Sequence, residues 1–223
     1  MEPSKLDTAH EYWDRWWGDA FGRAVWSEPD HTVTAFIPRL HERSAAAVLD
    51  VGTGIGRHAL AYARAGFEVT ATDASSKGLK ELERRAGELG LAVRTRLAPF
   101  SELPLPDRSI DHVLAWNVLY HGDGELVEAA FGECRRVLRE AGTFQLTMLS
   151  KRNSAYGVGR EIREDTFVDE SSKGDKDHPH FYVDAAGLTR MLAAAGFETL
   201  SLRDVDQRPV GAFHWEVLAE TLG

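Results

Sequence analysis

The stretch Val48-Leu49-Asp50-Val51-Gly52-Thr53-Gly54-Ile55-Gly56-Arg57-His58 decides the fold of this chain. It begins with an apolar run that ends in a carboxylate, continues with glycines at positions 52, 54 and 56, and leads into the helix-forming residues 59–65. This order predicts a strand, a tight turn and a helix, because glycines let the backbone bend sharply and the following helix presents unpaired N–H groups. A nucleotide-like ligand fits such a turn, although a glycine-rich connection that binds nothing has the same pattern.

The spacing of the glycines differs from that of dinucleotide-binding enzymes. Those enzymes place their third glycine three residues after the second. Here Arg57 stands at that position and the glycine comes one residue early. Asp50, two residues before the first glycine, can accept hydrogen bonds from an ammonium group or ribose hydroxyls, but it would repel a pyrophosphate. We therefore expect a cationic ligand rather than a polyphosphate.

A second carboxylate ends the next predicted strand, which is followed by Ala74 and Ser75. An acidic residue at the position of Asp73 can accept hydrogen bonds from two ribose hydroxyls. The stretch VLDVGTGIGRHALAYARAGFEVTATDAS, residues 48–75, resembles the class I S-adenosylmethionine-dependent methyltransferases. More narrowly, it is similar to the tellurite-resistance-B-like and ubiquinone-biosynthesis-like small-molecule methyltransferases. The resemblance covers roughly residues 26–205 and implies S-adenosyl-L-methionine as the cofactor.

The remaining pattern, taken with this resemblance, predicts a Rossmann-like α/β fold. We expect a doubly wound, seven-stranded sheet with a terminal antiparallel pair and helices on both faces. Strands are expected at 48–51, 66–73, 91–97, 109–117, 143–150, 197–205 and 212–218, and helices at 31–43, 77–89, 126–138 and 184–195, with Gly142 ending the third helix. Residues 1–223 are expected to form a single class I methyltransferase domain, with 1–43 as an N-terminal helical lid and 151–182 as a substrate-side insertion.

The composition and net charge of the chain indicate which classes of partner it binds. Hydrophobic residues make up 43% of the 223 residues and charged residues 27%, which is ordinary for a soluble protein. A net charge of −9 argues against nucleic acid as the main partner, because phosphate binding needs clustered Lys and Arg. The single cysteine, Cys134, fits a reducing cytoplasm, and no stretch is long and apolar enough for a signal peptide or membrane span. We expect a cytoplasmic protein with a small-molecule substrate, and a homodimer is reasonable.

Two segments are candidates for substrate contact. Between residues 9 and 26, Tyr12 and Trp16, and likewise Trp13 and Trp17, recur at i, i+4 and give one helix face an aromatic character. That face fits either a helix packed on the core or a lid over an apolar substrate. Residues 151–182 form a long polar connection, which is usually functional or disordered. We expect Trp16, Trp17, Tyr120 and Tyr182 to contact the substrate.

The resemblance also implies roles for individual residues. Asp50, Gly52, Gly54 and Gly56 would surround the methionine end of the cofactor, Asp73 and Ala74 the ribose, Phe100 the adenine, and Asn117 the methyl group. His121 is the first candidate for a general base and His180 the second. Pro99 stands where an acidic residue is common in the family, so a side-chain hydrogen bond to the adenine amine from that position is excluded.

A metal site is a weaker alternative. His178 and His180 lie at i, i+2 and, together with His121, could be metal ligands. No further His, Cys or carboxylate sits at a recognisable ligand spacing, so we expect no metal.

Methyl transfer to a small-molecule O- or N-nucleophile is therefore the leading hypothesis. Methylation of tellurite or selenite remains open, whereas arsenic-type methylation needs several thiolates and the chain has only Cys134. An NAD-type oxidoreductase is disfavoured by Arg57 at the third glycine position and by the antiparallel end of the sheet. A non-catalytic nucleotide-binding module is disfavoured by the intact Asp50 and Asp73.

Overall fold

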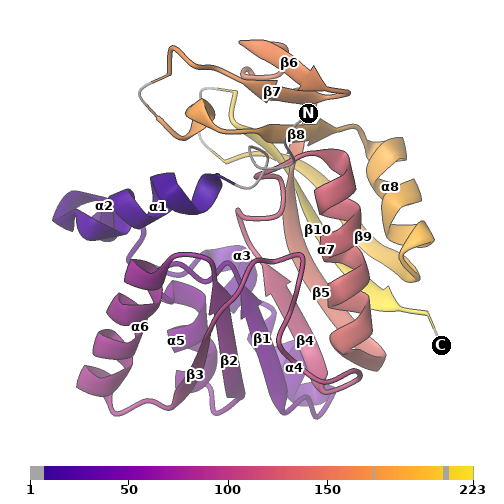
Figure 1. The fold of residues 1–223 in the computed structure, drawn as a ribbon. Helices are drawn as coiled ribbons and strands as arrows, with labels where there is room; N and C mark the ends of the chain where they lie inside the picture. The colour runs from indigo at the N-terminus through magenta and orange to yellow at the C-terminus, as the bar shows by residue number, and fades with distance from the viewer. Residues whose placement is uncertain (1–7, 173, 208–210, 223) are drawn as a thin grey trace.

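The computed structural model describes residues 8–172, 174–207 and 211–222, and its centre is a mostly parallel sheet (Figure 1). The strands of this central part are β1 (Ala47–Val51), β2 (Glu68–Asp73), β3 (Val93–Leu97), β4 (Ile110–Ala115), β5 (Leu138–Ser150), β9 (Phe197–Asp206) and β10 (Phe213–Thr221). Their order in space is β3-β2-β1-β4-β5-β10-β9, with β10 antiparallel to both of its neighbours. Strands β1 to β5 are parallel, so their carboxyl ends meet at one edge of the sheet, where such folds bind ligands.

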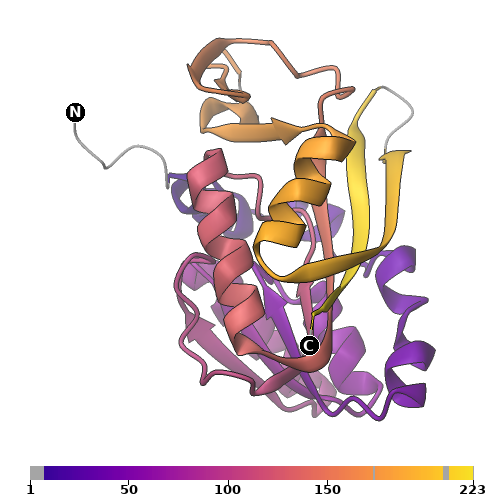
Figure 2. The same ribbon diagram turned by 90° about the vertical axis from the view of Figure 1, so that its right-hand side faces the viewer.

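Helices cover both faces of this sheet. They are α1 (Ala9–Gly18), α2 (Ala20–Val25), α3 (His31–Thr34), α4 (Ile37–Glu42), α5 (Arg57–Arg64), α6 (Ser76–Leu89), α7 (Gly124–Val137) and α8 (Ala185–Ala194). Alternate residues of β1 point to opposite faces. Leu49 and Val51 pack with α7 and α8, which lie on the near side in Figure 2, whereas Val48 packs with α3 to α6. The doubly wound α/β fold predicted from the sequence is confirmed.

The expected count of seven strands is too low, because the segment 151–182 contains three more. They are β6 (Arg160–Arg163), β7 (Thr166–Val168) and β8 (His180–Val183), with the short 3₁₀ helix η2 (Asp175–Asp177) between β7 and β8. β8 pairs with the end of β5 at Leu149 and Ser150, beyond the point where β4 stops pairing. The charged residues of β6 are mostly exposed, so this edge strand lacks the apolar alternation that marks a strand in sequence.

The expected end of the third long helix is also corrected. α7 ends at Val137 rather than running on toward Gly142, and β5 begins at Leu138. The left-handed residue in this connection is Ala141, with φ of 55°, and not the glycine that follows it. Leu138 is buried and pairs with Ile110 of β4, so tertiary packing draws it into the sheet despite its good helix propensity.

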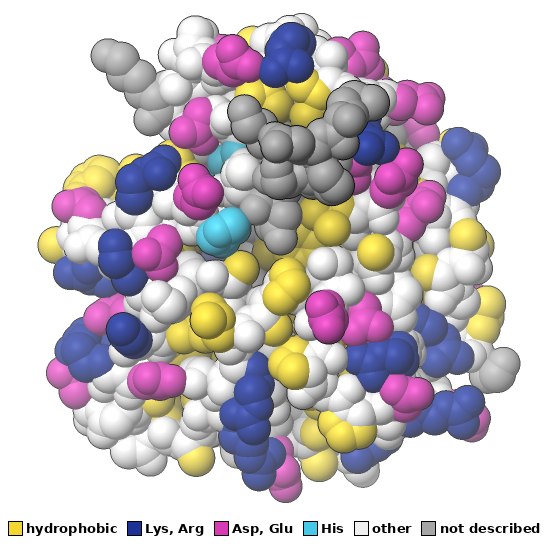
Figure 3. Space-filling model, in the orientation of Figure 1, with side chains coloured by type: hydrophobic (Ala, Val, Ile, Leu, Met, Phe, Trp, Pro, Cys, Tyr) yellow, Lys and Arg dark blue, Asp and Glu magenta, His cyan; other side chains and the backbone are white. Residues whose placement is uncertain are grey.

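Figure 3 shows Lys and Arg side chains interspersed with Asp and Glu over the face seen there. Within residues 8–172, 174–207 and 211–222, no helix combines the length and the apolar character needed to cross a membrane.

Candidate functional site

Hydrogen bonds to the side chain of Asp50 stabilise the glycine turn between β1 and α5. Its carboxylate oxygen Oδ2 accepts hydrogen bonds from Thr53 Oγ1 at 2.7 Å and from the backbone N–H of Ala59 at 3.1 Å. The side chain is only 1% exposed and does not line the cavity described below. Asp50 therefore shapes the turn and the start of α5, whereas the sequence predicts direct contact with the ligand.

Glycine is required in this turn for two different reasons. Gly52 and Gly54 line the cavity with φ of 62° and 55°, and Cβ atoms there would lie 2.1 Å from Val118 Cγ2 and 2.8 Å from Trp17 Cζ2, two side chains of the cavity wall. Gly56 lies outside the cavity lining, with φ of 79°, and a Cβ atom there would lie 2.1 Å from Leu82 Cδ1 of α6. The first two glycines let Val118 and Trp17 of the cavity wall approach the turn, and the third lets α6 pack closely against it.

Asp73, at the end of β2, lies in the cavity wall beside Ala74. Its Oδ2 accepts a hydrogen bond from Gly54 N at 2.7 Å and its Oδ1 accepts one from Ser75 N at 2.7 Å. Each carboxylate oxygen has a further lone pair that a hydroxyl could use. Burial raises the pKa of Asp73 to about 6 and that of Asp50 to about 7.

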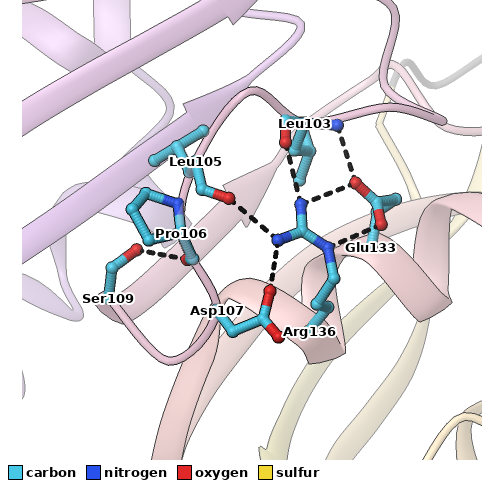
Figure 4. A network of polar contacts seen from close by, with 7 residues as sticks. All are labelled: Leu103, Leu105, Pro106, Asp107, Ser109, Glu133 and Arg136. Carbon is cyan, nitrogen blue, oxygen red and sulfur yellow. Dashed lines mark hydrogen bonds and ion pairs between the residues drawn. The ribbon is translucent and has the colours of Figure 1, made fainter.

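The loop after β3 brings Phe100 to the same cavity, together with Ala98 and Pro99. Arg136 of α7 holds this loop through its guanidinium, which donates to the carbonyls of Leu103 and Leu105 at 2.8 Å each (Figure 4). Glu133 completes the network by accepting from Leu103 N at 2.8 Å. The wall that carries Phe100 is thus tied to α7 by charge-assisted hydrogen bonds.

The aromatic helix α1 lies over the glycine turn. Trp13 and Trp17 line the cavity with their ring centroids 5.3 Å apart, and a Cβ atom on Gly54 would meet Trp17 at 2.8 Å. Asp14 attaches α1 to the start of α6 by accepting from Ser75 Oγ at 2.8 Å and Lys77 N at 3.0 Å. Trp16 lies outside the cavity lining and stacks on Tyr12. Of the predicted lid 1–43, residues 1–7 lie outside the described residues.

The opposite end of the cavity lies beyond β4, where Asn117 and His121 both line the wall. Asn117 has a left-handed backbone with φ of 60°, and its N–H donates to Thr147 Oγ1 at 2.7 Å. The His121 ring lies 5.8 Å from that of Trp13. Burial lowers the pKa of His121 well below its usual range, which leaves the imidazole neutral with a lone pair available.

These walls line one cavity, whose sides come from α1, the glycine turn, the end of β2, the loop after β3 and the residues after β4. Several of its wall residues were absent from the predicted site: Ala9, His10, Trp13, Trp26, Thr53, Ile55, Arg57, His58, Ala98, Pro99, Trp116 and Val118. Thr53, Ile55, Arg57 and His58 sit inside the glycine motif itself, so their sequence position could have indicated them. The Arg57 guanidinium lies 4.8 Å from the centre of the Trp26 ring.

The other predicted residues lie beside the cavity rather than in its lining. Tyr120 is buried with its ring 4.7 Å from that of His121, and the His180 ring lies 4.8 Å from His121. Tyr182 is 1% exposed and packs against Tyr156, at a ring distance of 5.6 Å.

His121, His178 and His180 gather at this end of the cavity. All three are buried, and one ring nitrogen from each lies within 4.8 Å of the others. The expectation of no metal rested on the lack of a further His, Cys or carboxylate at a recognisable ligand spacing. Folding brings His121 against His178 and His180, although it stands 57 residues before His178 in the sequence.

Comparison with known proteins agrees with this geometry. Residues 48–142 match the family described as methyltransferase domain. The chain is 25% identical over 219 residues to a Mycolicibacterium smegmatis protein named "Probable S-adenosylmethionine-dependent methyltransferase", covering 86% of this chain and 75% of that one. It is 31% identical over 116 residues to a ubiquinone biosynthesis O-methyltransferase of Caulobacter vibrioides, covering 51% of this chain and only 44% of that protein.

A solved structure shares the fold over the whole chain. It is the 1,6-didemethyltoxoflavin-N1-methyltransferase of Burkholderia thailandensis, with 1,6-didemethyltoxoflavin and S-adenosylhomocysteine bound. The TM-score is 0.71 at 23% identity, covering 100% of this chain and 94% of that one.

Proposed function

Since this chain is a class I S-adenosylmethionine-dependent methyltransferase, we propose that it transfers the methyl group to an oxygen or nitrogen atom of a small-molecule acceptor. One observation carries the proposal: a single cavity joins Asp73 and the glycine turn at one end to Asn117 and His121 at the other. The first end suits the nucleoside and the second end suits the acceptor.

At the cofactor end, the ribose hydroxyls would donate to the free lone pairs of Asp73. The adenine would lie against Phe100, and the methionine portion would follow Gly52 and Gly54. Arg57 is the cationic side chain in this part of the wall, and we assign it to the carboxylate of the methionine portion. Asp50, Gly56 and Trp16 are then positioning residues, because they lie outside the cavity lining.

At the acceptor end, the walls are aromatic and the polar groups are few. Trp13 and Trp26 offer flat apolar surfaces, and His121 offers a ring nitrogen. Such walls favour a small, largely apolar acceptor that carries one hydroxyl or amine. We place Tyr120 and His180 behind His121 and Tyr182 in the core, so His121 is the predicted base that faces the acceptor.

The chemistry needs little more than alignment. The acceptor lone pair attacks the methyl carbon while the carbon–sulfur bond breaks in line, and S-adenosylhomocysteine leaves. Holding donor and acceptor in contact inside the cavity supplies most of the acceleration. A hydroxyl or ammonium acceptor must also lose its proton, which requires a group at the His121 end.

The names of two similar proteins agree with an oxygen or a nitrogen acceptor. The Burkholderia thailandensis enzyme is an N1-methyltransferase by its name, and the Caulobacter vibrioides relative is an O-methyltransferase by its name. Both acceptor atoms have the lone pair that the proposed reaction uses.

Calorimetry tests the proposal. We expect micromolar binding of S-adenosylmethionine and S-adenosylhomocysteine, with no binding of NAD or NADP in the same buffer. A screen of phenols, hydroxyacids and heterocyclic amines, read by release of S-adenosylhomocysteine, then identifies the acceptor. Binding of NAD, or of neither adenosyl ligand, would refute the proposal.

A further inference from the structure

Three imidazoles meet at the acceptor end of the cavity, although they come from separate parts of the chain. His121 follows β4, whereas His178 lies two residues before β8 and His180 is the first residue of that strand. The ring centroids of His121 and His178 are 4.9 Å apart, and those of His178 and His180 are 4.6 Å apart. Their exposed fractions are 3% or less. Three buried imidazoles in contact require an explanation.

Hydrogen bonds fix the orientation of two of these rings. The Nδ1 of His180 lies 2.8 Å from the carbonyl oxygen of His178, so Nδ1 carries the proton and Nε2 carries the lone pair. The Nδ1 of His178 lies 3.2 Å from the Asp177 carboxylate, which favours the same tautomer. A carboxylate or carbonyl on the outer nitrogen is the usual second contact of a metal-bound histidine.

The inner nitrogens are incompletely satisfied. His121 Nε2 and His180 Nε2 are both buried without a hydrogen-bond partner. His121 Nδ1 and His178 Nε2 lie 2.9 Å apart, so one proton between them makes a hydrogen bond within this pair. That proton does nothing for His121 Nε2 or His180 Nε2. Packing alone would leave the lone pair of His121 Nε2 without a donor and that of His180 Nε2 facing the Asp175 carboxylate at 3.6 Å, which costs free energy. A cation among the rings would satisfy them.

A carboxylate stands at the edge of the cluster. Asp175 Oδ2 lies 3.6 Å from His180 Nε2, and the Asp175 side chain is partly exposed. Three imidazoles with a nearby carboxylate are ligands that suit zinc, iron, cobalt or nickel rather than magnesium or calcium. Within the described residues, His121 is the member of the three that also lines the cavity, so a bound ion would be reached from the acceptor side.

We propose that His121, His178 and His180 bind one divalent transition-metal ion of the zinc type, with Asp175 beside it, at the acceptor end of the cavity. Metal binding stands on the cluster alone, and only its role rests on the proposed function. There the ion would coordinate the hydroxyl of the acceptor and lower its pKa, so that the hydroxyl releases its proton to solvent water before the oxygen attacks the methyl carbon. His121 then acts as a ligand and not as the proton acceptor, since its lone pair is occupied.

Cobalt binding tests the site without any assay of turnover. Protein made without a histidine tag is stripped with a chelator, dialysed and titrated with Co²⁺, which absorbs visible light when imidazoles bind it. We expect one Co²⁺ per chain, displaced by Zn²⁺. The double variant His178→Gln/His180→Gln should bind Co²⁺ at least about 100-fold more weakly, because two of three ligands are lost.

Matched controls separate this site from adventitious binding. His31 and His41 are exposed histidines remote from the cluster in sequence, so His31→Gln/His41→Gln should bind Co²⁺ like the wild type. S-adenosylhomocysteine binding is measured on every sample, which reports that the cofactor end is folded.

The outcomes distinguish the two proposals. A wild type that binds S-adenosylhomocysteine but not Co²⁺ overturns the metal site and leaves the proposed function standing. Equal Co²⁺ binding by the wild type and the His178→Gln/His180→Gln variant places the ion elsewhere and also overturns the site. Stoichiometric Co²⁺ binding without S-adenosylhomocysteine binding supports the metal site and contradicts the proposed function.

Discussion

The cofactor end and the acceptor end of the cavity are assembled in different ways. The glycine turn and Asp73 lie within 22 residues of one another along the chain, on two adjacent parallel strands. The acceptor end joins α1, the residues after β4 and the segment around β8, which lie at widely separated positions between Ala9 and Val183 of the chain. Local sequence therefore dictates the first end, and only the complete fold creates the second.

This difference predicts that the cofactor end tolerates substitution less well than the segment 151–182. We expect the largest effect, on stability, when a glycine of the cofactor turn is replaced. Gly56 in the cofactor turn and Gly157 in the segment 151–182 have nearly equal φ angles of 79° and 77°. A Cβ atom would meet Leu82 at 2.1 Å in the first case and nothing within 4 Å in the second. We expect Gly56→Ala to lower the free energy of unfolding by about 3 kcal/mol, from strain plus overpacking, and Gly157→Ala by about 1 kcal/mol from strain alone.

Urea unfolding of both variants measures this contrast. Equal losses of stability would mean that the turn relaxes around a methyl group and is less rigid than its packing indicates.

Removal of the carboxylate of Asp73 at the cofactor end should have the next largest effect, and it should act on cofactor binding. Asp73→Ala removes the acceptors proposed for the ribose hydroxyls and leaves two backbone N–H groups unpaired. We expect the dissociation constant of S-adenosylhomocysteine, measured by calorimetry, to rise about 100-fold, equivalent to about 2.7 kcal/mol.

Asp111 provides the matched control for that variant. It also accepts from two backbone N–H groups, those of Ala46 and Ala47 at 2.9 and 2.8 Å, but it lies near the start of β4 and outside the cavity. Asp111→Ala should change stability without changing the dissociation constant. An unchanged affinity in Asp73→Ala would remove Asp73 from the ribose site.

Lowering the pH should weaken cofactor binding by a smaller factor than the Asp73→Ala substitution does. Ribose hydroxyls donate to the ionised form of Asp73, whose pKa is raised to about 6 by burial, so protonation below pH 6 opposes binding. We expect about a tenfold loss of S-adenosylhomocysteine affinity between pH 8 and pH 5. Asp50, with a pKa of about 7, acts in the same direction through the turn. Asp73→Asn should flatten the profile, and an equally steep profile in that variant would assign the dependence to another group.

We expect the smallest effect on cofactor binding from substitution of Arg57. Its side chain is partly exposed, so water screens its attraction for the cofactor carboxylate. Arg57→Gln should raise the dissociation constant of S-adenosylhomocysteine about three- to fivefold, or about 1 kcal/mol. The exposed Arg64 on the same helix lies outside the cavity, and Arg64→Gln should have no effect. Identical results for the two arginines would place the carboxylate elsewhere.

The same contrast explains what the sequence could predict. The motif around Gly52 and the carboxylate of Asp73 predicted the sheet, the turn and the cofactor, since they depend on neighbours in sequence. Within that motif, Asp50 was expected to touch the ligand, yet its hydrogen bonds to Thr53 and Ala59 place it behind the turn. Which side of a backbone turn a side chain occupies does not follow from spacing.

The acceptor end was less predictable for a physical reason. His178 and His180 are two residues apart, but their meeting with His121 depends on β8 pairing with the end of β5. The i, i+4 pattern in α1 indicated an aromatic face, but it did not distinguish Trp13 and Trp17, which line the cavity, from Trp16, which does not. Long-range strand pairing and helix placement decide these contacts.

A crystal structure of the protein with S-adenosylhomocysteine tests the central claim most directly. We predict that both ribose hydroxyls lie within hydrogen-bond distance of Asp73, that the adenine packs against Phe100, and that the sulfur points toward Asn117 and His121. A nucleoside bound away from Asp73, or a sulfur directed away from the His121 end, would contradict the assignment of one cavity to both donor and acceptor.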